Sequence, residues 1–581
     1  MSAIVILLIA VALLALGYIF YGSWLAKQWG VDPNHETPAH TSYDGKDFVP
    51  ANPAVLMGHH FSSIAGAGPI NGPIQAAVFG WVPVFLWVVI GGIFFGAMHD
   101  FGALFASIRH NGGSVGEVIK ANIGVRAQRL FTIFALLVLI LVIASFTAVV
   151  AGTFASVAPA GEEALPIFTV GRENVSGTAS TATTSLLFIV IAIIFGFFVY
   201  RKNAPIGPAT IVGIIGIVLI TLAGLNVGFN MSRTFWVIFI AVYITLASLL
   251  PVWILLQPRD YLSSFLLYGM MIIAFVGVIG SGATVDLPAF TGWKGINGNS
   301  NLFPVLFITV ACGAVSGFHS LIGSGTTAKQ LNSEKDAKVI GYGAMIVESA
   351  LAIVALIAVG VLFKETNIGG GDKFLLSAPP TIFAGGVATM VAQMFGGVAD
   401  FSNPVYDTVY TLLTLAVSVF ALTSLDSGTR LARYLFGELF IPEGKTRDDL
   451  KGAAKFFATP IVATLIMVVI GCGMGFMGLS QIWGVFGAAN QLLAGVAMLA
   501  VAAWLANIGK NNKMFLFPMA FMLVATITSL VTTIIQKAQA VVAGAPWGDW
   551  FQMIWSIGLV VLAVILVIEG VQVIFKKKEQ V

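Results

Sequence analysis

Apolar segments of about 20 residues follow one another along the whole chain and are separated by short polar stretches. A helix needs about 20 consecutive apolar residues to cross the hydrocarbon core of a bilayer, so the pattern predicts an all-α polytopic membrane protein with about 15 crossings. The expected helices span residues 3–24, 54–79, 82–108, 128–156, 183–200, 206–226, 233–256, 262–284, 302–328, 338–363, 404–424, 455–477, 483–507, 514–536 and 551–574. The apolar segment 379–397 is short and contains glycine, so we expect it to enter the membrane and return.

Lysine and arginine are distributed unevenly between the connections of these helices. If residues 25–53 are cytoplasmic and sides alternate from there, 23 basic residues lie on the cytoplasmic side and 6 lie outside. Cytoplasmic loops carry such an excess of basic residues. The bias predicts an outer N-terminus and an inner C-terminus, provided that 379–397 does not cross. Residues 1–20 lack a basic start and a clear cleavage site, so we interpret them as a first helix.

One predicted helix, 54–79, contains residues that a continuous helix resists. Proline removes a backbone donor and clashes with the preceding turn, and glycine adds backbone freedom. Freed backbone groups are too costly to face lipid, so we predict an interrupted helix beside a protein-enclosed cavity. A kinked helix packed through its small residues is the alternative. The helix-weakening residues are Gly66, Gly68, Pro69, Gly72 and Pro73.

This interruption is the predicted substrate site, because half-helix ends present free donors and an uncancelled dipole to a substrate. We expect Asn71 or Gly72 to cap the second half-helix, with Pro73 in its first turn. Such an end favours a carboxylate. Gln75, one turn further, either adds a polar contact or hydrogen-bonds a neighbouring helix. The candidate substrate residues are Gly66, Gly68, Pro69, Asn71, Gly72 and Gln75.

The spacing of the helices indicates an internal repeat. The order of a broken helix, a close second helix, a gap and a third helix at 54–156 recurs at 233–328. An odd number of helices separates the two starts, so the second unit is inverted, as in five-plus-five transporters. Pro251 marks a second expected break. The predicted division is an extra helix and cytoplasmic loop (1–50), a core (51–430, with repeats 54–226 and 233–424) and four further helices (431–581).

Composition supports a membrane protein and removes other classes. The 581 residues are 58% hydrophobic and 9% charged, whereas soluble domains carry about 25% charged residues. Two cysteines in apolar segments exclude a disulfide framework, and a net charge of +3 gives no indication of nucleic-acid binding. The chain has no phosphate-binding G-x-x-x-x-G-K-S/T loop and no arginine-rich voltage-sensing helix. Its seven scattered histidines form no catalytic constellation, so we expect no enzyme.

Ionisable residues at membrane depth are functional candidates by default. Carboxyl and imidazole groups can carry protons, so we predict a proton relay among them, with a structural hydrogen bond as the alternative for each. The candidates are Asp100, His60, His319, Glu348 and His99. A zinc site from His59, His60, His319 and Cys312 lacks any ligand spacing, so we predict no metal.

Other polar residues in the helices have less specific roles. The hydroxyls of Ser324, Thr326 and Thr327 suit a hard cation such as sodium, with small-residue helix packing as the alternative. Asp426 and Arg430 stand four residues apart and are expected to form a salt bridge at the inner face. The amides of Asn490 and Gln491 are expected to join helices outside the core.

Several of these motifs, in the same order, resemble the carbon starvation protein CstA family. They cover about residues 50–500 and are spread over most of the chain. The matching stretches are His59-His-Phe61, Ile64-Ala-Gly-Ala-Gly-Pro69, Phe95-Gly-Ala-Met-His-Asp-Phe101, Pro258-Arg-Asp-Tyr-Leu262, His319, Ser324-Gly-Thr-Thr-Ala-Lys-Gln330, Thr423-Ser-Leu-Asp-Ser-Gly-Thr-Arg430 and Phe486-Gly-Ala-Ala-Asn-Gln-Leu-Leu-Ala494.

The resemblance implies a bacterial inner-membrane secondary transporter with a LeuT-like five-plus-five inverted-repeat core and extra flanking helices. Members are linked to peptide uptake on nutrient starvation and a related branch to pyruvate uptake, with protons. By this similarity, residues 65–73 correspond to the broken first core helix, and Ala65 joins the 324–327 segment as a candidate cation site. The expected partners are a peptide or pyruvate and the lipid bilayer, without a cofactor. A nutrient sensor or scaffold that keeps a transporter fold is the alternative class.

Overall fold

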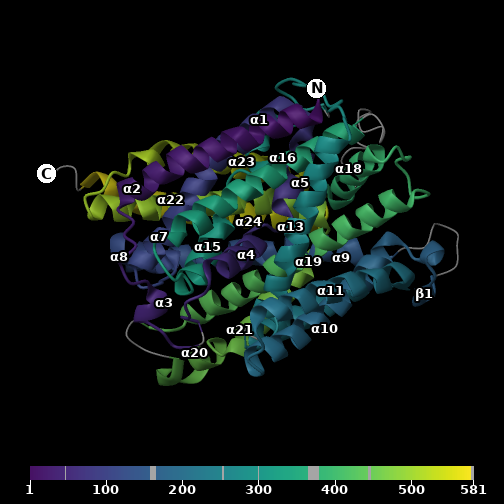
Figure 1. Cartoon of the computed structure of the whole chain (residues 1–581). Coiled ribbons are helices and arrows are strands. Elements are labelled where there is room, and N and C mark those ends of the chain that lie inside the picture. Colours follow the sequence, from purple (N-terminus) through teal and green to yellow (C-terminus); the bar gives the residue numbers. More distant parts are fainter. Residues whose placement is uncertain are drawn as a thin grey trace.

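Long helices that run in roughly the same direction make up most of the molecule (Figure 1). The structure, a computed structural model, describes residues 1–576 apart from 46, 157–164, 252–253, 297, 299, 364–378 and 443–446. Six of the basic residues counted above lie outside the described residues: Lys46, Lys364, Lys373, Lys445, Lys577 and Lys578.

Eleven helical spans among the described residues are long and apolar enough to cross a membrane. They are built from α1 (Ala3–Leu16) with α2 (Ser23–Trp29), α6 (Trp81–Gly91) with α7 (Ala97–Arg109), α9 (Val125–Phe154), α10 (Gly177–Gly196), α11 (Ile206–Asn226), α13 (Leu256–Gly280), α16 (Ala344–Leu362), α19 (Pro404–Glu438), α22 (Leu479–Asn507), α23 (Lys513–Val542) and α24 (Trp547–Lys576). The chain is thus a multi-pass membrane protein.

Shorter elements complete the described chain. Four of them form two interrupted helices, and two short strands pair antiparallel, with Phe168 opposite Phe229. The shorter helices are α3 (Pro38–Thr41), α4 (Pro53–Ile64), α5 (Gly68–Ala76), α8 (Val115–Asn122), α12 (Arg233–Leu249), α14 (Leu302–Thr309), α15 (Gly317–Gly325), α18 (Pro379–Met394), α20 (Gly452–Phe457) and α21 (Pro460–Gly475), and the strands are β1 (Phe168–Val170) and β2 (Val227–Phe229).

The first interrupted helix breaks between α4 and α5, in the segment where the sequence predicts an interruption. α4 ends at Ile64, and α5 begins at Gly68 with a proline in its first turn. The predicted cap at Asn71 or Gly72 is wrong, because Pro69 already fixes a helical start one turn earlier. Pro73, expected in the first turn, lies inside α5.

A second interruption lies between α14 and α15, where the sequence predicts one continuous helix over 302–328. α14 ends at Thr309 and α15 begins at Gly317. The expected break at Pro251 is wrong, because α12 is regular and ends at Leu249, before that proline. No proline marks residues 310–316, and the groups that satisfy their backbone come from a distant helix, so local sequence gives little sign of this break.

The packing of the helices is consistent with two related units. α5 packs on α16 as α15 packs on α7, and α9 packs on α19 near the centre. Helices α21 and α22 lie against α9 as α12 and α13 lie against α19. Finally, α13 contacts α4 as α22 contacts α15. Each contact made by a helix of the first unit thus has a counterpart made by the corresponding helix of the second unit. An inverted repeat requires this correspondence.

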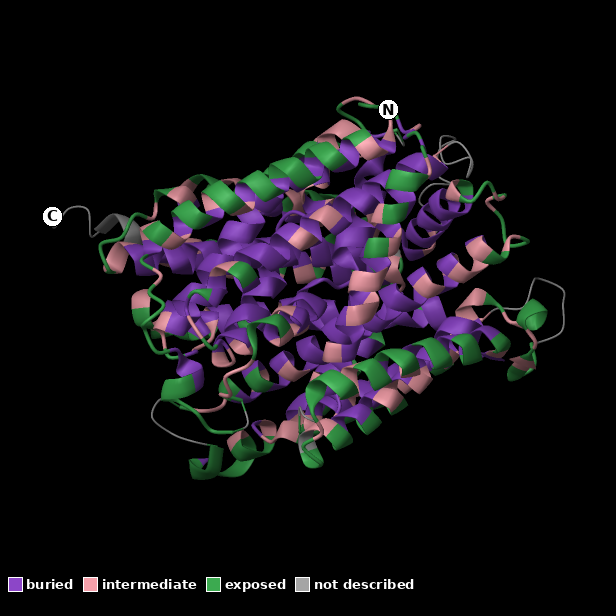
Figure 2. Ribbon diagram, in the orientation of Figure 1, coloured by how far each residue is buried: buried purple, intermediate pink, exposed green. Residues whose placement is uncertain are grey.

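Burial separates a central core from an apolar periphery. Figure 2 shows buried residues through the middle of the helix assembly and exposed residues along α1, α10 and α11. Large apolar side chains such as Leu8, Val212 and Leu219 are more than half exposed. Apolar side chains on the outside of a membrane protein face lipid, so these faces mark the bilayer contact.

Gly72 is required where the two interruptions approach each other. A Cβ at this position would lie 2.8 Å from the Thr309 carbonyl oxygen and 3.0 Å from the Val310 Cα. We expect Gly72→Ala to destabilise the protein by about 1–3 kcal/mol through overpacking. Thermal unfolding of the purified protein in detergent measures this. Gly269→Ala, where a Cβ meets nothing within 4 Å, is the control, and equal unfolding temperatures for both variants would contradict the close contact.

Candidate functional site

A chain of carboxyl and imidazole groups is buried beside the two interruptions. Asp100 on α7 lies 2.7 Å from His319 Nδ1 through one oxygen and 2.7 Å from His99 Nδ1 through the other. His319 Nε2 lies 3.5 Å from Glu348 on α16. All four side chains are at most 3% exposed. Four of the five predicted proton-relay candidates are therefore in one continuous group.

Close backbone contacts place these residues. A π-helical turn at Gly92–Gly96 precedes α7, and a Cβ at Gly96 would collide with the Ala314 carbonyl in the second interruption. α15 starts at Gly317, which lies directly against the backbone of α22 at Asn490 and Ala494. These small residues let α7 and α15 come close enough for Asp100 to reach His319.

The buried group keeps hydrogen-bonding capacity that the described chain does not use. Neither carboxylate oxygen of Glu348 and neither polar atom of the Asn71 amide has a hydrogen-bond partner among the described residues. The same holds for His99 Nε2 and His60 Nε2. Buried polar atoms without partners are costly and rare, so these atoms are candidates for contact with a substrate or a proton.

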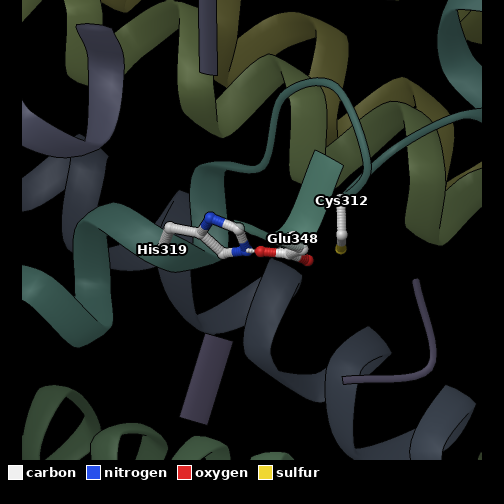
Figure 3. Close-up of side chains that lie close together, drawn as sticks. All are labelled: Cys312, His319 and Glu348. Carbon is white, nitrogen blue, oxygen red and sulfur yellow. Dashed lines mark ion pairs between the residues drawn. The ribbon is translucent and has the colours of Figure 1, made fainter. Parts of the chain in front are cut away.

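Cys312, His319 and Glu348 offer ligand atoms within 4.8 Å of one another (Figure 3). Nitrogen, sulfur and oxygen together are a donor set that transition metals accept. Asp100 lies 2.7 Å from His319 Nδ1, and Glu348 lies 3.5 Å from Nε2 without a hydrogen bond. A carboxylate at Nδ1 is a usual neighbour of a proton-carrying histidine and also of a metal-bound one, so the absence of a metal stays a prediction. His59, another member of the four-residue zinc set considered from sequence, faces Asp260 instead.

His60, the fifth candidate, is separate from this chain. Its Nδ1 lies 2.8 Å from the hydroxyl of Thr327, which the sequence places among the cation candidates. The hydroxyls of Ser324 and Thr326 donate to carbonyls of their own helix, at Ser320 and Ile322. The three hydroxyls therefore already make hydrogen bonds within the chain.

The candidate substrate residues lie along the first interruption and α5. Gly66 is in the interruption, and Gly68 with Pro69 forms the first turn of α5, against Cys312. Asn71 is fully buried, and its side-chain amide has no hydrogen-bond partner among the described residues. Gln75 is partly exposed near the end of α5.

The second interruption is supported by α22, which the sequence places outside the core. Asn490 Oδ1 accepts a hydrogen bond from the Phe318 N–H at the start of α15, 2.8 Å away. Gln491 Nε2 donates to the carbonyl of Val310 just after α14, at 3.2 Å. These amides satisfy backbone groups freed by the interruption, so they are more than contacts between helices. An Asn-Gln pair in an apolar segment was the available signal.

A second buried group of charged side chains joins α13 and α19 and contacts α4, the first half of the first interrupted helix. The Arg259 guanidinium on α13 contacts Asp426 on α19, donates to the Tyr243 hydroxyl at 2.6 Å and donates to Asp260 at 2.9 Å. Asp260 in turn lies 3.3 Å from His59 on α4.

The expected pair of Asp426 with Arg430 is wrong. Arg430 donates to the Leu250 carbonyl instead. Tertiary packing brings Arg259 to Asp426 across two helices, and spacing along one helix does not show this.

Two cavities lie on opposite sides of the first interruption. Three positions along α19 show this order. Thr414 lines a cavity of about 490 Å³, and Ser427 lines a second cavity of about 170 Å³. Between them, the Ser424 hydroxyl donates a hydrogen bond to the Ser63 carbonyl at the end of α4. His59 and Asp260 also line the second cavity, which therefore reaches the Arg259 group. The two cavities therefore lie on either side of the contact between α19 and the end of α4.

We expect Arg259→Met to destabilise the protein by about 3–5 kcal/mol, because it leaves the carboxylates of Asp426 and Asp260 buried without their cation. Unfolding in detergent measures the loss. Arg172→Met, which removes an exposed pair with Asp407, is the control and should cost less than about 1 kcal/mol. Equal stability of the two variants would show that the buried group does not hold these helices together.

The fold is shared with a solved transporter. The structure of the Eremococcus coleocola manganese transporter bound to an aromatic bis-isothiourea compound aligns with a TM-score of 0.51 at 12% identity, covering 92% of this chain and 99% of that one. At this identity the likeness concerns the fold alone. Together with the exchanged helix contacts, it shows a LeuT-like five-plus-five inverted-repeat core with extra flanking helices.

Sequence relatives are transporters. The peptide transporter CstA of Bacillus subtilis is 34% identical, over 90% of this chain and 89% of that protein. The peptide transporter CstA of Campylobacter jejuni is 33% identical, over 90% and 79%. The pyruvate/proton symporter BtsT of Escherichia coli is 31% identical, over 91% and 81%. The family model of carbon starvation protein CstA matches residues 2–372 and 366–529. The chain therefore belongs to the carbon starvation protein CstA family.

Proposed function

We propose that this protein is a secondary transporter that takes up short peptides together with protons by alternating access. The observation that carries the proposal is the buried chain from His99 through Asp100 and His319 to Glu348, which lies beside both interrupted helices. Ionisable groups at membrane depth mark proton relays in transporters. Because His319 is on the second interrupted helix, a change in its protonation acts directly on a moving part of the site.

The substrate site is proposed at the start of α5. The N–H groups of a helix start favour a carboxylate, and the Asn71 amide supplies an unused donor and an unused acceptor. A peptide also carries an ammonium group, which would be accepted by Asp100 or by the unwound carbonyls between α14 and α15. Gly66, Gly68, Pro69, Gly72 and Gln75 would form the surrounding surface.

Pyruvate is the second candidate substrate. It also bears a carboxylate, and the relative from Escherichia coli is named a pyruvate/proton symporter. Several other relatives, including those of Bacillus subtilis and Campylobacter jejuni, are named peptide transporters, which supports peptide as the first choice.

The coupling ion is proposed to be a proton, with sodium as the alternative. A sodium ion would use the carbonyl of Ala65 and the hydroxyls of Ser324, Thr326 and Thr327. Ser324 Oγ already accepts a hydrogen bond from the Val115 N–H, and the Thr327 hydroxyl lies 2.8 Å from His60 Nδ1, so oxygens that sodium would need are already in use, which favours the proton.

We also propose a division of the chain that differs from the one expected from sequence. The first unit comprises α4–α5, α6–α7, α9, α12 and α13, with α10 and α11 as an inserted hairpin. The second comprises α14–α15, α16, α19, α21 and α22, with α18 as a segment that does not cross. Counting each interrupted helix as one crossing keeps 15 spans, with the N-terminus outside, in the bacterial inner membrane. We further propose that uptake takes place during nutrient starvation, which the family name supports.

Uptake into proteoliposomes tests this function. Labelled dipeptide and labelled pyruvate are offered separately, with an imposed pH gradient, acidic outside, or with a sodium gradient. We expect uphill accumulation of the dipeptide driven by the pH gradient. Accumulation of pyruvate alone would select the second candidate, and accumulation driven by sodium alone would exclude the proton. No accumulation by folded protein would favour a nutrient sensor or scaffold.

We expect Asp100→Asn to abolish proton-driven uptake, because an amide cannot take up the proton that the neighbouring histidines share with Asp100. Gly68→Leu should also abolish uptake, because its side chain would occupy the space of Cys312. Initial rates in proteoliposomes and membrane levels of the protein are the measurements. Asp407→Asn, in an exposed pair, and Gly484→Leu, where a Cβ meets nothing within 4 Å, should keep normal rates. Unchanged uptake in both site variants would reject the proposed site.

A further inference from the structure

The larger of the two cavities lies beyond the first interruption, at the end of the helices where α12 and α22 begin. It has a volume of about 490 Å³ and is lined mostly by apolar atoms. Its lining comes from α9, α10, α12, α18, α19 and α22 and the turns before them. No part of the cavity belongs to the proposed site at α5.

Two helices connect this cavity with the interruption. On α9, Phe146 packs against Gly66, while Val149, Gly152 and Thr153 line the cavity one to two turns further. On α19, Thr414 in the lining is ten residues from Ser424 at the interruption, a rise of about 15 Å. The cavity and the interruption therefore share α9 and α19, with Phe146 between them on α9.

Arg233 is the one charged side chain in the described lining of this cavity. Its guanidinium donates to the Gly475 carbonyl at 2.8 Å and to the Phe476 carbonyl at 3.5 Å, at the end of α21. Arginine has five N–H donors, so these two bonds orient the group and leave donors for a ligand. Arg233 has no carboxylate partner in the part of the chain that the structure describes. A fixed guanidinium of this kind binds carboxylates.

Aromatic and aliphatic groups face the same cavity. Tyr410 lies with its ring 5.0 Å from that of Phe401, and Val149 and Leu479 add further apolar surface. Mostly apolar cavities with a few polar groups that fix orientation are typical of sites for organic ligands. An acid as small as pyruvate would use Arg233 but leave most of this apolar surface without contact.

We propose that this cavity is an entry subsite for short peptides with an apolar side chain, in which Arg233 binds the peptide carboxylate. The proposal rests on the proposed function and specifies its substrate class. The peptide side chain packs between Tyr410 on α19 and Val149 on α9. Pyruvate has no such side chain and does not need this subsite.

Two variants test the subsite in the full-length protein in lipid nanodiscs and proteoliposomes. Arg233→Gln removes the cation, and we expect it to weaken binding of a labelled alanyl-phenylalanine dipeptide about tenfold, by losing a charge-assisted hydrogen bond. Gly152→Trp fills the cavity from a position where a Cβ meets nothing within 4 Å. It should reduce binding and uptake of this dipeptide and leave pyruvate uptake, if the wild type shows it, unchanged.

Matched controls separate the subsite from general damage. Arg172→Gln removes an arginine that is paired with Asp407 and is outside the lining, and Gly484→Trp adds the same bulk at another open glycine. Both should behave as the wild type. Normal dipeptide binding in Arg233→Gln and Gly152→Trp would overturn the subsite while the proposed function stands. Equal loss of dipeptide and pyruvate uptake in Gly152→Trp would show an entry path without peptide preference. If the wild type neither binds nor accumulates the dipeptide, the peptide function itself fails, and the subsite with it.

Discussion

Backbone groups that leave a helix inside a membrane must find partners in the protein, and this constraint determines much of the core. The Ser424 hydroxyl satisfies the carbonyl of Ser63 at the end of α4. Asn490 and Gln491 on α22 satisfy the start of α15 and the chain just after α14. Each interruption is thus completed by a helix far away in sequence, because lipid offers no alternative partner. The central position of α19 and α22 follows from that need.

Sequence patterns predict the helices and the first interruption because both are local properties. Apolar length reveals a crossing, and Gly66, Gly68, Pro69, Gly72 and Pro73 within eight residues weaken a helix wherever it folds. The second interruption has no such mark, since small apolar residues between Thr309 and Gly317 are equally compatible with a regular helix. This interruption depends on tertiary contacts, because the side-chain amides of Asn490 and Gln491 on α22 hydrogen-bond the backbone there.

The candidate site was predicted as a set of residues and not as an arrangement. Asp100, His319 and Glu348 stand out because each is an ionisable residue in an apolar segment, but only the structure shows that they form one chain. Arg259 shows the opposite case, since it falls in the short connection between the predicted helices 233–256 and 262–284 and therefore among the polar loop residues. In the structure it is fully buried and joins Tyr243, Asp260 and Asp426. Contacts between helices decide whether such a residue lies in a loop or in a buried ion pair. A single sequence does not show those contacts directly.

The glycine contacts between the interruptions have a mechanical consequence. Gly68 lies against Cys312, Gly72 against the Thr309 carbonyl, and Gly313 near Pro69. The Cys312 side chain fills the space beside Gly68, and Gly72 meets the backbone at Thr309 and Val310 directly, so neither segment has room to shift alone. A tilt of α5 therefore displaces the chain between α14 and α15, and with it the start of the helix that carries His319. Under the proposed function, substrate binding at α5 and proton binding at His319 would therefore move both interrupted helices together.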